Sequence, residues 1–200
     1  MRYRTIVADP PWDHSDGTGA TITVGLSQRP HPNPHPTGPG YEYLSVDEIA
    51  SLPVTDLAES DAHLYLWTTN RYLRNVWDVA EAWGFRGVCV LTWCKPAPGI
   101  QIGGIWRSNT EFCLFARRGN LKAIGAAPSR WYEWPRRRGP SVREGERRVG
   151  GHSAKPEPFM DIVEQVSPGP HLELFARRQR LGWDTWGNEA LCHVNLEANA

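Results

Sequence analysis

The sequence predicts an α/β fold with a mainly parallel sheet. Short apolar runs alternate with amphipathic stretches along most of the chain, and at least five of these runs have the length and composition of strands. The 200 residues suffice for one domain with a sizeable core, and no internal repeat divides them. We therefore expect a single domain over residues 1–200.

The expected elements follow in order along the chain. Apolar runs predict strands over residues 4–8, 62–69, 86–93, 110–116 and 171–177. Ser45 and Glu48 have the spacing of a capping box, which predicts a short helix that Pro53 ends. Apolar residues at helical spacing predict a second helix over 72–83, closed by Gly84, and a third over 158–166.

Two segments are expected to be loops. Residues 13–40 are rich in Gly, Pro, His, Ser and Thr, and they exceed the usual length of a structureless connection. We expect a substrate-gating loop there, with plain disorder as the alternative. Residues 130–148 carry seven arginines interleaved with Trp131, Tyr132 and Trp134. This mixture suits stacking on bases and pairing with phosphates, and the alternative is a solvated loop with internal salt bridges.

Composition restricts the classes of function. Lys+Arg and Asp+Glu both number 22, so no global field draws the chain to nucleic acid or to a membrane. No apolar run approaches the roughly 20 residues of a membrane span. The N-terminus has no signal-peptide pattern, and we expect a cytoplasmic protein. The four cysteines lack C-x-x-C spacing, so we expect reduced, buried thiols, with a zinc site as the alternative: Cys89, Cys94, Cys113 and Cys192.

Asp9-Pro10-Pro11-Trp12 directly follows the first expected strand. Parallel sheets present their chemistry at the carboxyl ends of strands, so Asp9 and Trp12 should stand at a cleft. The Asp9 carboxylate and the Pro10 carbonyl can both accept hydrogens from an exocyclic amine, while Trp12 can stack on a planar ring. These residues predict a site for an amino-bearing base. The alternative is an N-cap Asp before a prolyl turn, with a core Trp.

Six motifs in order carry a resemblance to a known family. They are Asp9-Pro10-Pro11-Trp12, Tyr41-x-x-Leu44-Ser45, Leu64-Tyr65-Leu66-Trp67, Ser153-x-Lys155-Pro156, Glu173-Leu174-Phe175-Ala176-Arg177 and Trp186-Gly187-Asn188-Glu189. This pattern resembles the DPPW-type adenine N6-methyltransferases (the MTA-seventy family) over nearly the whole chain. The resemblance implies a Rossmann-like fold that uses S-adenosylmethionine (SAM), with permuted motif order: the catalytic strand precedes the cofactor strand.

The resemblance also implies roles for individual residues. Asp9, Pro10, Pro11 and Trp12 would form the catalytic segment, and Asp9 would also contact the cofactor. Beside these implied roles, we expect Trp12 and Tyr41 to stack on or border the target base, and the arginine-rich segment to bind the substrate through Arg136, Arg137 and Arg138. For SAM, Lys155 would meet the carboxylate, Phe175 would line the adenine, and the ribose hydroxyls would be held by Arg177, Asn188 and Glu189. The chemistry agrees, because carboxylate and amide groups accept from a diol and a Lys ammonium pairs with a carboxylate. No metal is required.

We therefore expect a SAM-dependent enzyme that methylates the N6 amino group of adenine in DNA. The base must be accessible, so it is either flipped from a duplex or presented by a single strand. An RNA substrate and a non-catalytic nucleic-acid-binding partner subunit are the alternatives within the family. An iron oxygenase that uses His14 and Asp16 is the alternative outside it. The oligomeric state stays open, a homodimer included.

Overall fold

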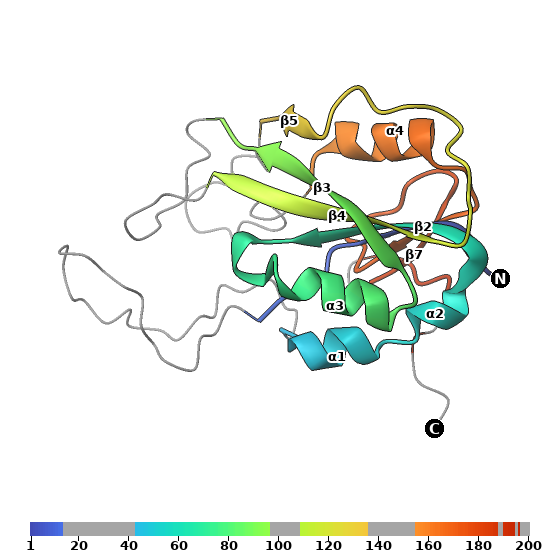
Figure 1. Cartoon of the computed structure of the whole chain (residues 1–200). Coiled ribbons are helices and arrows are strands. Elements are labelled where there is room, and N and C mark those ends of the chain that lie inside the picture. The colour runs from blue at the N-terminus through green and yellow to red at the C-terminus, as the bar shows by residue number, and fades with distance from the viewer. Residues whose placement is uncertain (14–42, 97–108, 136–154, 188–189, 195, 197–200) are drawn as a thin grey trace, which may run out of the picture.

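The computed structural model describes residues 1–13, 43–96, 109–135, 155–187, 190–194 and 196. A seven-stranded sheet lies between helices on its two faces (Figure 1). The strands are β1 Tyr3–Ala8, β2 Ala58–Thr68, β3 Arg86–Cys94, β4 Thr110–Arg118, β5 Trp131–Glu133, β6 His171–Leu174 and β7 Trp183–Trp186. The helices are α1 Val46–Ser51, α2 Val54–Leu57, α3 Asn75–Ala82 and α4 Glu157–Val166, with a 3-10 turn at Asn70–Tyr72.

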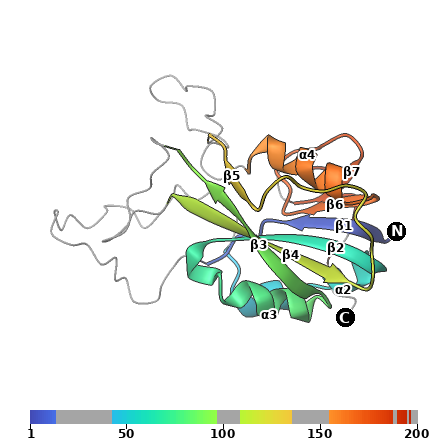
Figure 2. The same ribbon diagram turned by 45° about the horizontal axis from the view of Figure 1, so that its top comes forward.

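The sheet is mainly parallel, as the sequence predicts. Its strand order is β5-β3-β4-β2-β1-β6-β7. The parallel pairs are β1–β2, β1–β6, β6–β7 and β3–β5, whereas β4 runs antiparallel to both of its neighbours, β2 and β3 (Figure 2). The reversed β4 has a consequence for the site, because its first residues lie beside the last residues of β2.

Strand β1 lies inside the sheet between β2 and β6. Residues Ile6, Val7 and Ala8 are all buried, as expected for a strand with a neighbour on each side. On β6, Val7 pairs with Glu173 and Ala8 pairs with Leu174. The strand that ends in the Asp9 motif therefore lies directly beside the strand that carries the expected cofactor motif, although the two are far apart in the sequence.

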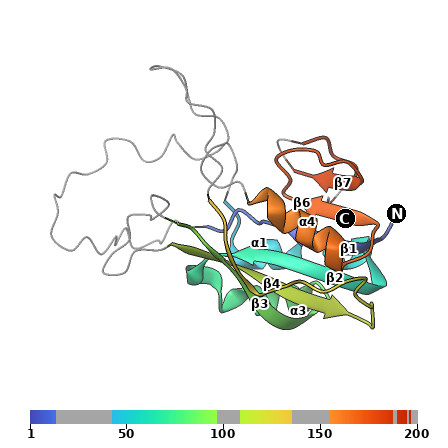
Figure 3. The ribbon, with the colours of Figure 1, turned by 90° about the horizontal axis from the view of Figure 1, so that it is seen from above.

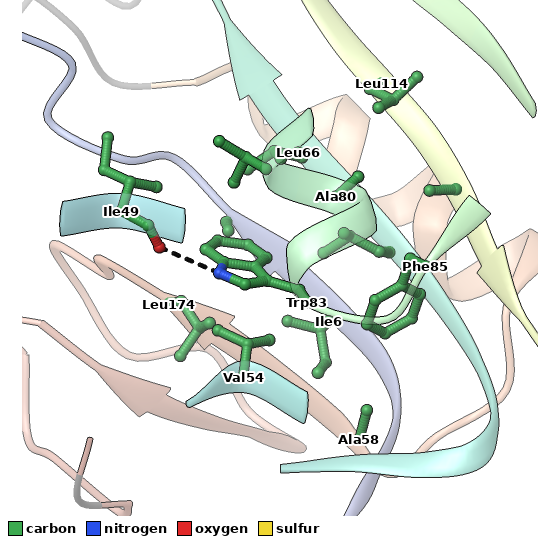
Figure 4. Packing of buried hydrophobic residues seen from close by; sticks show 14 of the residues in the cluster. Ile6, Ile49, Val54, Ala58, Leu66, Ala80, Trp83, Phe85, Leu114 and Leu174 are labelled. Atoms are coloured by element: carbon green, nitrogen blue, oxygen red, sulfur yellow. Dashed lines mark hydrogen bonds between the residues drawn. The ribbon is translucent and has the colours of Figure 1, made fainter. Parts of the chain in front are cut away.

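Two helical layers cover the sheet. Helices α1 and α3 lie on one face and α4 lies on the other (Figures 1 and 3). Between the sheet and α1/α3, Trp83 is fully buried, and its indole N–H donates to the Ile49 carbonyl at 3.0 Å (Figure 4). Under α4, Phe159 packs against Tyr65 and Trp67 of β2. Within the described part of the chain, no helix is long and apolar enough to cross a membrane.

The capping box forms as predicted. The Ser45 hydroxyl accepts from the Glu48 amide, and the Glu48 carboxylate accepts from the Ser45 amide. The helix predicted to begin at Tyr72 instead begins at Asn75, because Tyr72 ends the preceding 3-10 turn. The strand predicted to reach Arg177 ends at Leu174, because Phe175 has φ +62° and leaves the extended conformation.

Three short elements were not expected: α2, β7 and β5. Strand β5 lies in the segment predicted to be a loop over 130–148, and its backbone pairs with the end of β3.

All four cysteines are free. Cys113 is fully buried, as predicted, and Cys89 and Cys94 are half-buried. The prediction of a buried thiol is wrong for Cys192, which is exposed. The expected loop over 13–40 lies almost entirely outside the described residues.

Candidate active site

The Asp9-Pro10-Pro11-Trp12 segment is held by its own backbone and by its neighbours. The Pro10 carbonyl accepts from the Trp12 amide at 2.9 Å, and the Pro11 carbonyl accepts from the Leu44 amide at 2.9 Å. The two prolines cannot donate backbone hydrogen bonds, so they end β1 and fix a turn at its carboxyl end. This turn places Asp9 at the edge of the sheet between the ends of β2 and β6.

Trp12 is a core residue in this structure. It is only 3% exposed, its indole N–H donates to the Trp67 carbonyl at 2.9 Å, and its ring stacks on Tyr72 with 5.2 Å between centroids. Trp12 thus occupies a core position, which was the alternative to a base-stacking role in the sequence-based interpretation. Stacking of Trp12 on a substrate base remains a prediction, and it requires the indole to leave this position.

Asp9 contacts Lys155, a residue that lies far away in the sequence. The Lys155 Nζ is 2.7 Å from the Asp9 Oδ2, and it also lies 5.3 Å from the centre of the Trp67 ring. Lys155 lies just before α4, and the position of this helix on the sheet brings the Lys155 ammonium to the end of β1. Asp9, expected to be catalytic, and Lys155, expected to bind the cofactor, therefore meet at one point.

A second carboxylate, that of Glu111, extends the contact into a chain of four charges. The Lys155 Nζ is 3.2 Å from the Glu111 Oε2, and Glu111 also forms an ion pair with Lys95. Burial would raise the pKa of Glu111, but the two ammonium groups outweigh it and hold that pKa below its ordinary value. Burial would likewise lower the pKa of Lys155, but Asp9 and Glu111 raise it above its ordinary value.

Glu111 and Lys95 are site residues for which no role was predicted from the sequence. Their signal was a charged residue at the start or the end of an otherwise apolar strand. For Glu111 this pattern indicates the site only when the direction of β4 is known. Because β4 runs antiparallel to β2, the start of β4 lies at the same end of the sheet as Asp9.

Unpaired polar atoms lie at the same edge. The indole nitrogen of Trp67 and the hydroxyl of Thr69 are buried, and neither has a hydrogen-bond partner among the described residues. Buried polar atoms are nearly always paired, so an unpaired atom marks a place where a ligand or water completes the site.

On β6, burial raises the pKa of Glu173 to about 7; Arg178 opposes this shift and Asp9 adds to it.

The end of β6 adopts a strained conformation beside Gly187. Phe175 has a positive φ, and its ring packs edge-to-face on Trp186. A Cβ at Gly187 would lie 2.2 Å from the Ala176 carbonyl oxygen, so only glycine allows these two backbone segments to approach so closely. Gly187 therefore brings the chain that leads into residues 188–189 against the Phe175 segment. Arg177 directly follows this segment.

Several predicted site residues lie outside the described part of the chain: Tyr41, Arg136, Arg137, Arg138, Asn188 and Glu189. His14 and Asp16 of the alternative iron site also lie outside it. Across the described ranges, no group of three or more His, Cys, Asp or Glu side chains is placed to hold a metal ion. The aromatic residues before the arginines are described: Trp131 is 56% exposed, and Tyr132 stacks on Trp134 with centroids 4.5 Å apart.

Comparison with known proteins identifies the family of the chain. Residues 3–189 match the MT-A70 family. The chain is 29% identical to the Type II methyltransferase M.MunI of a Mycoplasma species, covering 94% of this chain and 78% of that protein.

Two human relatives are matched over smaller shares of their length. The N(6)-adenosine-methyltransferase catalytic subunit METTL3 is 26% identical, covering 94% of this chain and 28% of that protein. The N(6)-adenine-specific methyltransferase METTL4 is also 26% identical, covering 94% of this chain and 38% of that protein. The resemblance inferred from the six motifs and the Rossmann-like α/β fold that it implies are thus confirmed. The chain belongs to the MT-A70 family.

Proposed function

We propose that this protein transfers a methyl group from SAM to the N6 amino group of adenine in DNA. The observation that carries the proposal is the contact between Asp9 and Lys155 at the carboxyl end of β1. It joins the acid expected to act on the amine to the cation expected to hold the cofactor. In the proposed reaction SAM supplies an electrophilic methyl group when it is bound.

The charges at this edge of the sheet suit that cofactor. SAM carries a carboxylate, an ammonium and a sulfonium group. The Lys155 ammonium provides the positive partner, while Asp9 and the neighbouring Glu173 provide negative ones. The unpaired atoms of Trp67 and Thr69 add a donor and a hydroxyl for further polar groups of a ligand. We also assign Phe175 and Arg177, with Asn188 and Glu189, to the adenosine part of the cofactor.

Asp9 and Pro10 would activate the adenine amine. The nitrogen lone pair of this amine is delocalised into the ring, so the amine is a poor nucleophile. Hydrogen bonds from the amine to the Asp9 carboxylate and the Pro10 carbonyl favour a pyramidal nitrogen and stabilise its developing positive charge. The Pro10 carbonyl already accepts from the Trp12 amide and retains a second lone pair for this bond.

We propose DNA rather than RNA as the substrate. In support, the chain is slightly more similar to the Type II methyltransferase M.MunI, at 29% identity, than to the N(6)-adenosine-methyltransferase METTL3, at 26% identity. The exposed Trp131 and the Tyr132–Trp134 stack provide aromatic surface for bases, and Arg136, Arg137 and Arg138 follow them in the sequence. We assign these three arginines to substrate phosphates, and Tyr41 to the border of the target base.

Transfer of a tritiated methyl group from SAM tests the proposal. Single-stranded DNA, duplex DNA and RNA of matched sequence are compared, with the Asp9→Ala variant in parallel. The proposal predicts label on a DNA substrate that disappears with Asp9→Ala. Label on RNA alone would identify an RNA enzyme. SAM binding without any label would mean a missing partner or recognition sequence, and no SAM binding would favour the non-catalytic subunit.

A further inference from the structure

The four charged groups at the site belong to four different parts of the chain. Asp9 follows β1, Lys155 precedes α4, Glu111 lies at the start of β4 and Lys95 follows β3. Contacts join them in the order Asp9, Lys155, Glu111, Lys95. Two carboxylates and two ammonium groups give a chain with no net charge.

The two ends of this chain differ in exposure. The Asp9 side chain is 24% exposed, whereas the Lys95 side chain is 4% exposed. Lys95 is further held by its position 4.8 Å from the centre of the Trp93 ring, a cation–π contact. The Lys95 end is therefore fixed in the protein, and the Asp9 end is the one that a ligand can reach.

Packing alone gives little reason for this arrangement. Placing four charges where solvent is largely excluded costs desolvation free energy, and well-packed apolar side chains would often be at least as stable. What the ion pairs do is fix the position of one atom, the Lys155 Nζ. The Lys155 Nζ contacts two carboxylates, those of Asp9 and Glu111, and the Trp67 ring lies beside it.

We propose that Glu111, held by Lys95, is a positioning residue that keeps the Lys155 ammonium beside Asp9. This inference rests on the proposed function, in which Lys155 also meets the carboxylate of SAM. The Lys155 ammonium has three N–H donors, so it can contact Asp9, Glu111 and the SAM carboxylate together. With Asp9 as its only partner in the protein, the ammonium would lose its anchor when Asp9 turns toward the substrate amine. Because Glu111 holds the ammonium from the buried side, Lys155 keeps its position while Asp9 turns toward the substrate amine.

Nuclear magnetic resonance of nitrogen-labelled lysine side chains tests the positioning without activity. The held ammonium of Lys155 should give a protected resonance, identified by its loss in Lys155→Met. In Glu111→Gln this resonance should broaden or exchange rapidly with water, whereas Glu81→Gln, on an exposed part of α3, should leave it unchanged. An unchanged Lys155 resonance in Glu111→Gln would overturn the proposal. Glu111→Asp, which keeps the charge on a shorter side chain, replaces Glu111→Gln if that variant does not fold.

A double-mutant cycle then separates positioning from a general structural role. Glu111→Gln should lower kcat by about tenfold in the wild-type background, but by less than about twofold when Lys155 is already Met. An equal loss in both backgrounds would mean that Glu111 does not act through Lys155. Lys95→Met should have a smaller effect in the same direction, with the exposed Lys122→Met as its control.

The two proposals fail separately. If the wild-type protein neither binds SAM nor transfers a methyl group, the proposed function fails, and the lysine resonance still decides whether Glu111 holds Lys155. If the wild type is active but the resonance and the kcat cycle show no coupling, the positioning role fails and the proposed function stands.

Discussion

The two faces of the sheet bury side chains of different kinds. Under α1 and α3 the buried side chains form a large apolar cluster, and the indole N–H of Trp83 is paired with the Ile49 carbonyl. On the α4 face, aromatic side chains pack together, for example Phe159 against Trp67. At the carboxyl end of β1, however, the protein holds the chain of four charges and two unpaired polar atoms.

This difference separates stability from function. Apolar burial contributes free energy of folding in proportion to the area removed from water, so the α1/α3 face stabilises the fold. Buried charges and unpaired polar atoms contribute little or cost stability. The gathering of four charges and two unpaired atoms at one end of the sheet therefore supports the candidate site at the carboxyl end of β1.

Truncation of Trp83 should have the largest effect on stability. Trp83→Ala removes a fully buried ring and leaves the Ile49 carbonyl without its donor, so we expect the free energy of unfolding to fall by about 3–5 kcal/mol. Urea unfolding measures this loss. Trp131→Ala is the matched control, because Trp131 is 56% exposed, and it should change stability by less than about 0.5 kcal/mol. Similar losses for the two variants would contradict the assignment of the α1/α3 face as the main stabilising core.

Substitution of Gly187 should disturb the end of β6. The new Cβ in Gly187→Ala would lie 2.2 Å from the Ala176 carbonyl oxygen, so the backbone must shift, at a cost of about 2 kcal/mol. Because the backbone that must shift, Ala176, directly follows Phe175, SAM affinity measured by calorimetry should fall as well. Gly182→Ala is the control for backbone strain, since Gly182 has φ +80° but no atom within 4 Å of the added Cβ. Equal SAM affinity in the two variants would contradict a role for this segment in binding.

Neutralising Glu173 should stabilise the protein at alkaline pH. Its pKa is raised from 4.5 to about 7 in the folded state, so the folded protein binds the proton more tightly than the unfolded chain. Stability therefore falls as pH rises from about 4.5 to 7, and Glu173→Gln should remove this fall. We expect a gain of about 1–2 kcal/mol at pH 8 and a smaller gain at pH 5. The same gain at both values would show that the carboxylate does not titrate in this way.

The sequence predicted the fold better than it predicted the contacts within the site. Apolar runs and caps predicted β1 to β4, β6 and helices α1, α3 and α4, because burial and local hydrogen bonding act over a few residues. Strand β5 was missed because it has only three residues and lies in a charged, proline-rich stretch. Trp12 was expected to line a cleft, with a core position as the alternative, but packing on Tyr72, which no local pattern reveals, encloses it.

The sequence predicted the candidate site only in part, because the contacts within it depend on the tertiary fold. Asp9 and Lys155 were singled out by motif, but their contact depends on α4 folding over the end of β1. Glu111 was missed because strand direction is a tertiary property. In a parallel β4, the first residues of the strand would lie at the opposite edge of the sheet, and only the antiparallel pairing with β2 brings Glu111 to Lys155.

The most direct test compares Asp9→Ala with Lys155→Met in two measurements made on the same preparations, the dissociation constant for SAM and the rate of methyl transfer to DNA. Asp9→Ala should lower the rate by at least about a hundredfold while SAM affinity changes much less, because Asp9 acts on the amine in the transition state. Lys155→Met should weaken SAM binding by about tenfold, since it removes a charged partner of the cofactor carboxylate. Turnover that is unchanged in Asp9→Ala would contradict the account.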